Sequence, residues 1–105
     1  MSWFWLVLAG ICEVGWPLGL KLASNPAFKI WGPALALVSM TLSGIFLWLS
    51  LKGIPIGTAY AVWTSMGAVG TFLVGVYFFN DPQSLLRWLG VALIVAGVVV
   101  LKLSS

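Results

Sequence analysis

Apolar residues fill four long runs of the chain, and short segments rich in proline, glycine and asparagine separate them. The runs cover about 3–22, 31–51, 56–79 and 85–103. Each is close to the roughly 20 residues that an α-helix needs to cross the hydrocarbon core of a bilayer. No stretch alternates strictly enough to suggest the strands of a membrane barrel. The pattern predicts an all-α membrane protein with four transmembrane helices in a single domain, 1–105.

The composition excludes most other classes. Of the 105 residues, 62% are hydrophobic and 7% are charged, whereas soluble domains have about 25% charged residues. A soluble enzyme, a nucleic-acid module and a disordered tail are therefore excluded, and no enzymatic activity is expected. With no histidine, one cysteine and two acids, the chain offers no metal site, and we expect no cofactor. Cys12 lacks a disulfide partner and is expected to be a small core residue.

The basic residues are nearly balanced between the two sides of the membrane. In a four-span chain, Lys21, Lys29 and Arg87 fall on one side, and Lys52 and Lys102 fall on the other. The excess of basic residues sets membrane orientation, and here the difference is about one charge. One dominant loop charge could still fix a single orientation. The count favours insertion both ways, which leads to an antiparallel, dual-topology homodimer like the inverted repeats of transporters. The N-terminus has no basic segment typical of a cleaved signal peptide, so the first span is expected to be retained.

Glu13 is the residue that the membrane tolerates least. It lies near the middle of the first run, about 15 Å from either end at 1.5 Å per residue. A carboxylate at that depth costs at least about 2.5–3.5 kcal/mol and normally faces a bundle interior or a water-filled cavity. One interpretation is a protonated side chain that joins helices. Since Ser or Thr would do this more cheaply, we favour an ion or proton site. Asp81, beside Pro82, is expected in a solvated turn.

Polar and aromatic residues on three spans are candidate neighbours of Glu13. Trp16 follows at i+3 and offers an indole N–H. Pro17 at i+4 cannot donate to the Glu13 carbonyl, although it could be only a tolerated kink. Ser43 lies near mid-span in a stripe of serines, which could also serve packing alone. Tyr60 and Trp63 share a face of the third span; an alternative role for Tyr60 is anchoring at the membrane interface.

Small residues mark two further features. Gly67 in the third span is a candidate hinge, because glycines permit both close approach and bending. Gly90, Ile94 and Gly97 lie on one seam of the fourth span, and this seam is predicted to contact a second copy of the chain. Packing within one four-helix bundle is the alternative use of the same seam.

Taken together, these residues resemble the small multidrug resistance family of bacterial inner-membrane exporters over the whole chain. The likeness includes the lone Glu13, the run PIGTAYAVWT at 55–64 and the run GVALIVAGV at 90–98, which is similar to that family's dimerisation motif. Within the family, EVGW at 13–16 and GTAY at 57–60 resemble the guanidinium-exporter subtype.

The resemblance implies a proton-coupled antiporter that exports guanidinium from the bacterial cell across the inner membrane. Glu13 would bind protons and substrate in competition, and the site would be lined by Trp16, Ser43, Tyr60 and Trp63. An exporter of quaternary ammonium or other hydrophobic cations is the alternative. A small dual-topology fluoride channel also fits the size, but an anion pore would not hold an acid at its centre.

Two residues depart from the family pattern. Pro17 is not the commonest residue at its place, and Ser65 stands where the family usually has glycine. Because that glycine belongs to the proposed bend of the third helix, the hinge would be stiffer or shifted to Gly67. The substrate range could also be wider than guanidinium alone.

Overall fold

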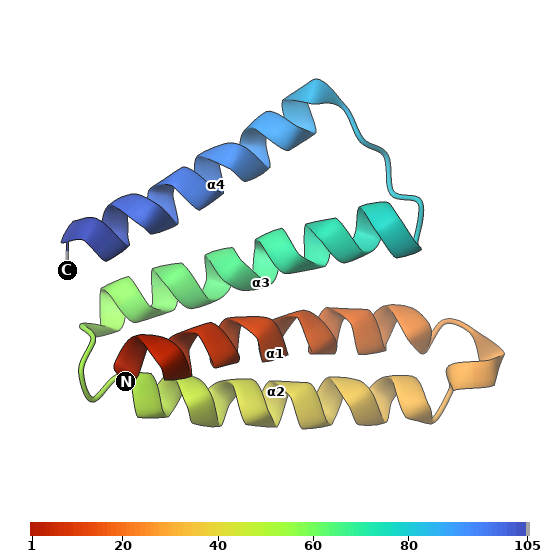
Figure 1. Cartoon of the computed structure of the whole chain (residues 1–105). Coiled ribbons are helices and arrows are strands. Elements are labelled where there is room, and N and C mark those ends of the chain that lie inside the picture. The colour runs from red at the N-terminus through yellow and green to blue at the C-terminus, as the bar shows by residue number, and fades with distance from the viewer. Residues whose placement is uncertain (105) are drawn as a thin grey trace.

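The chain folds into helices that run back and forth, so that both termini lie at the same end (Figure 1). The computed structural model describes residues 1–104, and this part contains four α-helices and one short 3₁₀ turn, η1. All four α-helices are long and apolar enough to cross a membrane. The all-α, four-span prediction is therefore confirmed. The elements are α1 (Ser2–Leu22), η1 (Pro26–Phe28), α2 (Trp31–Ser50), α3 (Ile56–Phe78) and α4 (Leu85–Ser104).

Local chemistry explains where the helices begin and end. In the α1–α2 connection the Asn25 side chain accepts a hydrogen bond from the Ala27 N–H at 3.0 Å, which starts η1. Pro55 is extended, with φ −57° and ψ 142°, and α3 begins directly after it. After α3, Asn80 adopts φ 54°, a left-handed conformation that asparagine tolerates better than most residues. The helix bounds differ from the apolar runs by at most one residue at either end.

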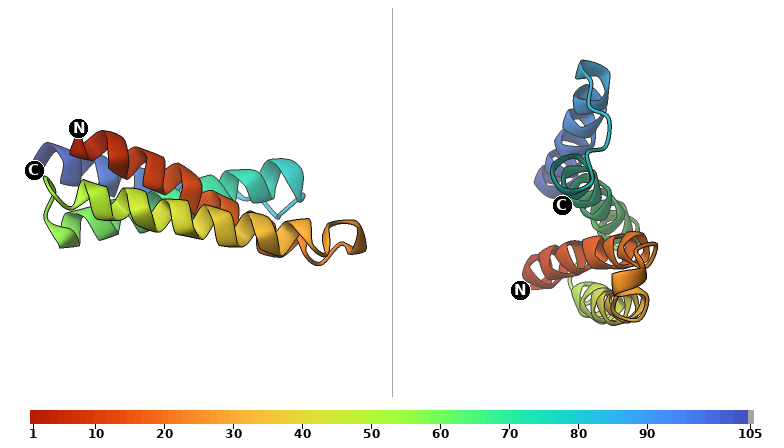
Figure 2. Two further views of the ribbon diagram at one scale, coloured as in Figure 1. Left: turned by 90° about the horizontal axis from the view of Figure 1, so that it is seen from below. Right: turned by 90° about the vertical axis from the view of Figure 1, so that its right-hand side faces the viewer.

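Helix α1 lies between α2 and α3, as the end-on view in Figure 2 shows. Glycines let α1 and α2 approach closely: a Cβ added to Gly19 would lie 2.5 Å from the Gly32 carbonyl oxygen. Small residues at a crossing allow such backbone contact in membranes. A small core forms toward the other end of α1, where Leu6, Val62 and Ile54 are buried together. The three helices α1, α2 and α3 therefore form one packed unit.

Helix α4 is different, because none of its described residues is buried. It diverges from α3 toward their connection (Figure 1), and an edge-on ring contact between Phe72 and Trp88, with centroids 5.2 Å apart, joins the two helices there. A Cβ added at Gly90 or Gly97 would meet nothing within 4 Å. Helix α4 thus leaves most of its surface without a partner in the same chain.

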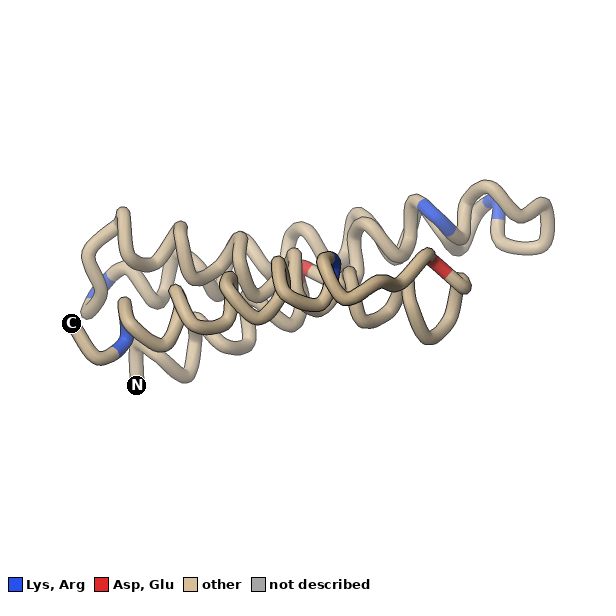
Figure 3. Tube along the Cα trace, turned by 90° about the horizontal axis from the view of Figure 1, so that it is seen from above, with Lys and Arg blue, Asp and Glu red and all other residues tan. Residues whose placement is uncertain are grey.

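Charged residues are sparse along the trace, with long uncharged stretches between them (Figure 3). Two lysines lie over tryptophan rings: Lys102 Nζ is 4.6 Å from the Trp3 ring centroid, and Lys52 Nζ is 5.8 Å from that of Trp48. Long basic side chains near helix ends commonly extend to the membrane interface, where tryptophan is also enriched. This arrangement suits a helix bundle that spans the bilayer.

Candidate functional site

Glu13 lies on α1 with its side chain directed against α3. It is partly buried, and a Cβ added at Gly67 would collide with its Cγ. Gly67 therefore provides the space that the glutamate side chain occupies. The sequence singled out Gly67 as a hinge, but its contact with Glu13 was not foreseen.

Two neutral donors hold the carboxylate. The Trp16 indole Nε1–H donates to Glu13 Oε1 at 2.5 Å, and the Ser43 hydroxyl lies 3.2 Å from Oε2. Trp16 comes from the next turn of α1, as the i+3 spacing predicts. Ser43 comes from α2, so the site joins two helices through one carboxylate.

Ser43 is the centre of this hydrogen-bond network. Its side chain is fully buried, and its hydroxyl accepts a hydrogen bond from Trp63 Nε1–H at 2.7 Å. It also lies 2.7 Å from the Ala9 carbonyl oxygen. A hydroxyl has one hydrogen to donate, so Ser43 supplies it fully to either Ala9 or Glu13. The hydroxyl can therefore turn toward the carbonyl when the carboxylate no longer needs a donor.

Tyr60 is joined to this network through its ring alone. Its ring centroid is 5.4 Å from that of Trp63, its side chain is 57% exposed, and among the residues described its hydroxyl makes no hydrogen bond to Glu13. The other serines of α2 point elsewhere: Ser50 donates to the Leu47 carbonyl at 2.6 Å. Of the predicted lining residues, the structure thus brings Trp16, Ser43 and Trp63 together, with Tyr60 at the edge.

The remaining predicted residues lie outside this network. Helix α3 continues through Gly67 without interruption, and Pro17 likewise stays within a continuous α1. Ile94 is 38% exposed on the open face of α4, between the two glycines with free space beside them. The hinge and the dimer contact therefore remain predictions.

One partner of the network escaped the sequence analysis. The Ala9 carbonyl could not be predicted from the sequence, because every residue has a backbone carbonyl group. Gly67 was detectable in principle, since it follows Trp63 at i+4 and shares its face of α3.

No group of three or more His, Cys, Asp or Glu side chains that could hold a metal occurs within residues 1–104.

The chemistry of this arrangement suits a small cation. The groups that donate to the carboxylate are neutral, so they orient its oxygens without cancelling its charge. The Trp16 indole bonds to the carboxylate and the Trp63 indole bonds to Ser43, and the faces of indole rings attract cations. A carboxylate that is partly exposed at mid-helix can bind either a proton or a cation with several N–H groups.

Comparisons with known proteins match most or all of the chain. The family model described as "Small Multidrug Resistance protein" matches residues 1–94. The guanidinium exporter of Yersinia pestis is 44% identical over 105 residues, covering 100% of both chains. That of Proteus vulgaris is 42% identical over 106 residues with the same coverage. That of Escherichia coli K12 is 39% identical over 105 residues, covering 100% of this chain and 99% of the relative.

Proposed function

The chain belongs to the small multidrug resistance family, and from this premise we propose that it exports guanidinium across the bacterial inner membrane in exchange for protons. Three relatives named as guanidinium exporters match it over its whole length. The observation that carries the proposal is the carboxylate of Glu13, held at mid-span by Trp16 and Ser43.

Guanidinium matches this carboxylate in shape and charge. It is planar, permanently charged and presents forked N–H donors that pair with both oxygens of a carboxylate. To receive that fork, Oε1 and Oε2 must face the substrate edge-on. The Trp16 and Ser43 donors, one on each oxygen, fix this orientation. The Trp16 and Trp63 rings add cation–π attraction.

Protons and guanidinium compete for the same group in the proposed cycle. Protonation removes the charge that binds the cation, and a bound cation excludes the proton. Transport follows when the assembly changes its open side only with the carboxylates occupied. Protons that enter then displace guanidinium, which leaves on the other side. In a dimer of two identical, oppositely oriented subunits, the inward-open and outward-open states are equal in energy by symmetry.

The antiparallel homodimer is part of the same proposal. Helix α4 has no buried residue, and Gly90 and Gly97 have open space beside them. Small residues on such a face favour helix–helix contact in lipid. We assign the Gly90, Ile94 and Gly97 seam to contact with the second subunit, and the hinge of α3 to Gly67.

Proteoliposomes that contain a pH-sensitive dye test the function directly. We expect an inward guanidinium gradient to drive protons out of vesicles with the wild-type protein and to do nothing with Glu13→Gln. Glu13→Asp, which keeps a carboxylate, is the matched control and retains coupled movement. Tetramethylammonium distinguishes the alternative, since it has no N–H donor and is not expected to drive protons. Proton-coupled guanidinium transport by a dimeric Glu13→Gln variant would refute the role of Glu13.

Orientation requires its own experiment. Single cysteines placed in a connection are expected to react with membrane-impermeant reagents from both sides of the membrane. Adding a lysine after Ser2 should shift the population to one orientation, because the present balance is about one charge. Labelling of the unmodified protein from one side only would overturn the antiparallel homodimer.

A further inference from the structure

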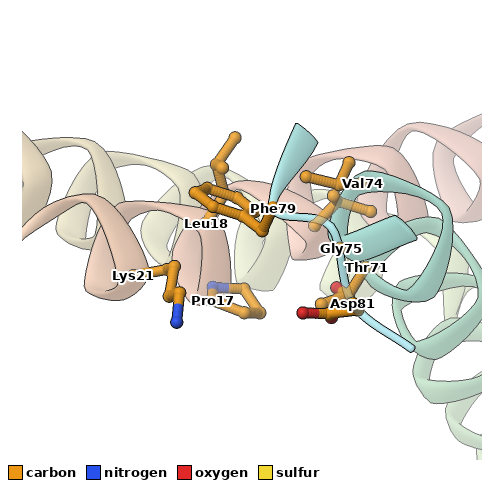
Figure 4. A pocket seen from close by; sticks show the side chains of 9 residues that line it. Pro17, Leu18, Lys21, Thr71, Val74, Gly75, Phe79 and Asp81 are labelled. Atoms are coloured by element: carbon orange, nitrogen blue, oxygen red, sulfur yellow. The ribbon is translucent and has the colours of Figure 1, made fainter. Parts of the chain in front are cut away.

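A cavity lies at the end of the bundle where α1 finishes and α3 gives way to its connection with α4 (Figure 4). Its volume is about 170 Å³. It is separate from the hydrogen-bond network around Glu13, which contributes none of its lining residues. Those that matter here are Pro17, Lys21, Thr71, Gly75, Phe79 and Asp81.

The local fold directs Asp81 into this cavity. Asn80 turns the chain back with φ 54°, and the Asp81 N–H then donates to the Gly75 carbonyl at 3.0 Å. A Cβ at Gly75 would collide with Asp81 Oδ2, so glycine is needed for the carboxylate to lie against α3. Figure 4 shows the carboxylate pointing toward Pro17 across the cavity. Asp81 is exposed, as expected of a residue in the connection, and its carboxylate lies against Gly75.

A cation already occupies the other wall. The Lys21 ammonium lies 5.9 Å from the centroid of the Phe79 ring, within the range of cation–π attraction. Among the residues described, no lysine or arginine nitrogen forms an ion pair with Asp81. The cavity therefore combines an aromatic face, an unpaired carboxylate and a tethered ammonium that could leave for water.

The cavity and the central site are neighbours along α1 and α3. Pro17 is one turn of α1 from Glu13, and Thr71 is one turn of α3 from Gly67, the residue against which the Glu13 side chain packs. Residues four apart lie on one face of a helix, and one turn rises about 5.4 Å. The Asp81 carboxylate lies against Gly75, which is about two turns of α3 from Gly67, so a cation bound beside Asp81 is about two turns from the central carboxylate.

We propose that this cavity is a vestibule site, in which the Asp81 carboxylate and the Phe79 ring bind a small organic cation such as guanidinium before it reaches Glu13. Lys21 is a built-in competitor, which occupies the site when no free cation is present. The inference rests on the proposed export function for the identity of its ligand, but the site itself can be tested without transport.

A thiol probe measures the electrostatic character of the cavity. Thr71→Cys in a Cys12→Ala background places one reactive sulfur on the wall, and its reaction rates are compared for a trimethylammonium methanethiosulfonate and a neutral one of similar size. We expect Asp81→Asn to lower the cationic-to-neutral rate ratio about two- to fivefold, as exposed charge pairs contribute. Lys21→Gln should raise the ratio by a similar factor, and guanidinium should slow both reactions.

Two controls define the result. Lys29→Gln removes a lysine from the same end of the molecule but outside the cavity, and it should leave the ratio unchanged. Asp81→Glu keeps the charge and should preserve the wild-type ratio, while high salt should reduce every difference. If Asp81→Asn leaves the ratio as in the parent, or if Lys29→Gln matches Lys21→Gln, the vestibule site is wrong.

Transport kinetics separate this inference from the proposed function. We expect Asp81→Asn to raise the KM for guanidinium about two- to fivefold with little change in kcat, and Lys21→Gln to lower KM. Wild-type transport with an unaltered KM in Asp81→Asn would overturn the vestibule and leave the export function standing. Absence of guanidinium transport by the wild type, with the thiol ratio still dependent on Asp81, would remove the export function and keep a cation site.

Discussion

Helices α1 to α3 and helix α4 are made of similar residues but are used differently. Each of the first three has buried residues, including Ala9, Ser43 and Gly67, whereas α4 has none among those described. The glycines express the contrast most clearly. A Cβ at Gly67 would collide with Glu13, while one at Gly97 would meet nothing.

This difference teaches that apolar composition does not determine which surfaces of a membrane protein pack. In lipid, no hydrophobic force distinguishes a helix neighbour from an acyl chain, so close backbone approach and hydrogen bonds decide the contacts. The first three helices have both, through the α1–α2 glycine crossing and the Ser43 network. Helix α4 also has small residues, but a Cβ at Gly90 or Gly97 would contact nothing in its own chain. We interpret helices α1 to α3 as the unit that forms the binding site and α4 as the surface for assembly.

The largest expected effect comes from filling the space at Gly67. Gly67→Ala places a methyl group where the Glu13 side chain lies, and the glutamate must move away from its donors. Because small displacements of binding groups are costly, we expect kcat/KM for guanidinium to fall at least about tenfold, measured in proteoliposomes. Gly44→Ala, at a glycine with nothing within 4 Å, is the matched control. Equal losses in both variants would contradict the role of Gly67.

Filling the space on α4 should act on assembly instead. A Cβ at Gly97 meets no atom within 4 Å, so we expect Gly97→Leu to keep the helix content of the wild type. The bulky side chain should keep two α4 helices apart, and we expect dimerisation to weaken about tenfold, or roughly 1.4 kcal/mol. Subunit exchange measured by energy transfer between labelled copies in liposomes tests this. An unchanged dimer affinity would show that the Gly97 face of α4 contacts lipid instead of a second subunit.

Removing the Ser43 hydroxyl should have a smaller effect. Ser43→Ala takes one donor from Glu13 and the acceptor from Trp63, and hydrogen bonds between membrane helices contribute about 1 kcal/mol. We expect guanidinium affinity, measured by calorimetry, to fall about fivefold. Ser43→Cys keeps a weak donor, and its affinity for guanidinium should lie between those of the wild type and Ser43→Ala. An affinity equal to that of the wild type would remove Ser43 from the site.

The smallest effect is expected at Ser50, which is also fully buried on α2. Its hydroxyl donates to the Leu47 carbonyl of its own helix, so Ser50→Ala leaves no partner on another helix unsatisfied. We expect guanidinium affinity and transport to change less than about twofold, within the usual range for local backbone contacts. A loss as large as that of Ser43→Ala would show that burial, rather than contact with Glu13, determines the effect.

The extent of the helices could be predicted from sequence because the thickness of the bilayer fixes the length of an apolar run. The Glu13–Trp16 contact followed from helical periodicity, and Ser43 from its depth in the membrane. The contacts that could not be predicted from the sequence depend on how the helices cross. The approach of Gly67 to Glu13 requires the separation of α1 and α3, which no local pattern encodes. The Ala9 carbonyl has no sequence signature at all.

The indole of Trp16 donates to the Glu13 carboxylate and is also a fluorophore, one of the 7 tryptophans of the chain. Binding of a proton or a cation at Oε1 changes the electrostatic environment of the excited indole dipole, and with it the emission of Trp16. The molecule therefore carries a label-free optical reporter at its centre. Replacing the five tryptophans outside the hydrogen-bond network by phenylalanine would leave emission from Trp16 and Trp63 and let occupancy be followed in real time in an intact membrane.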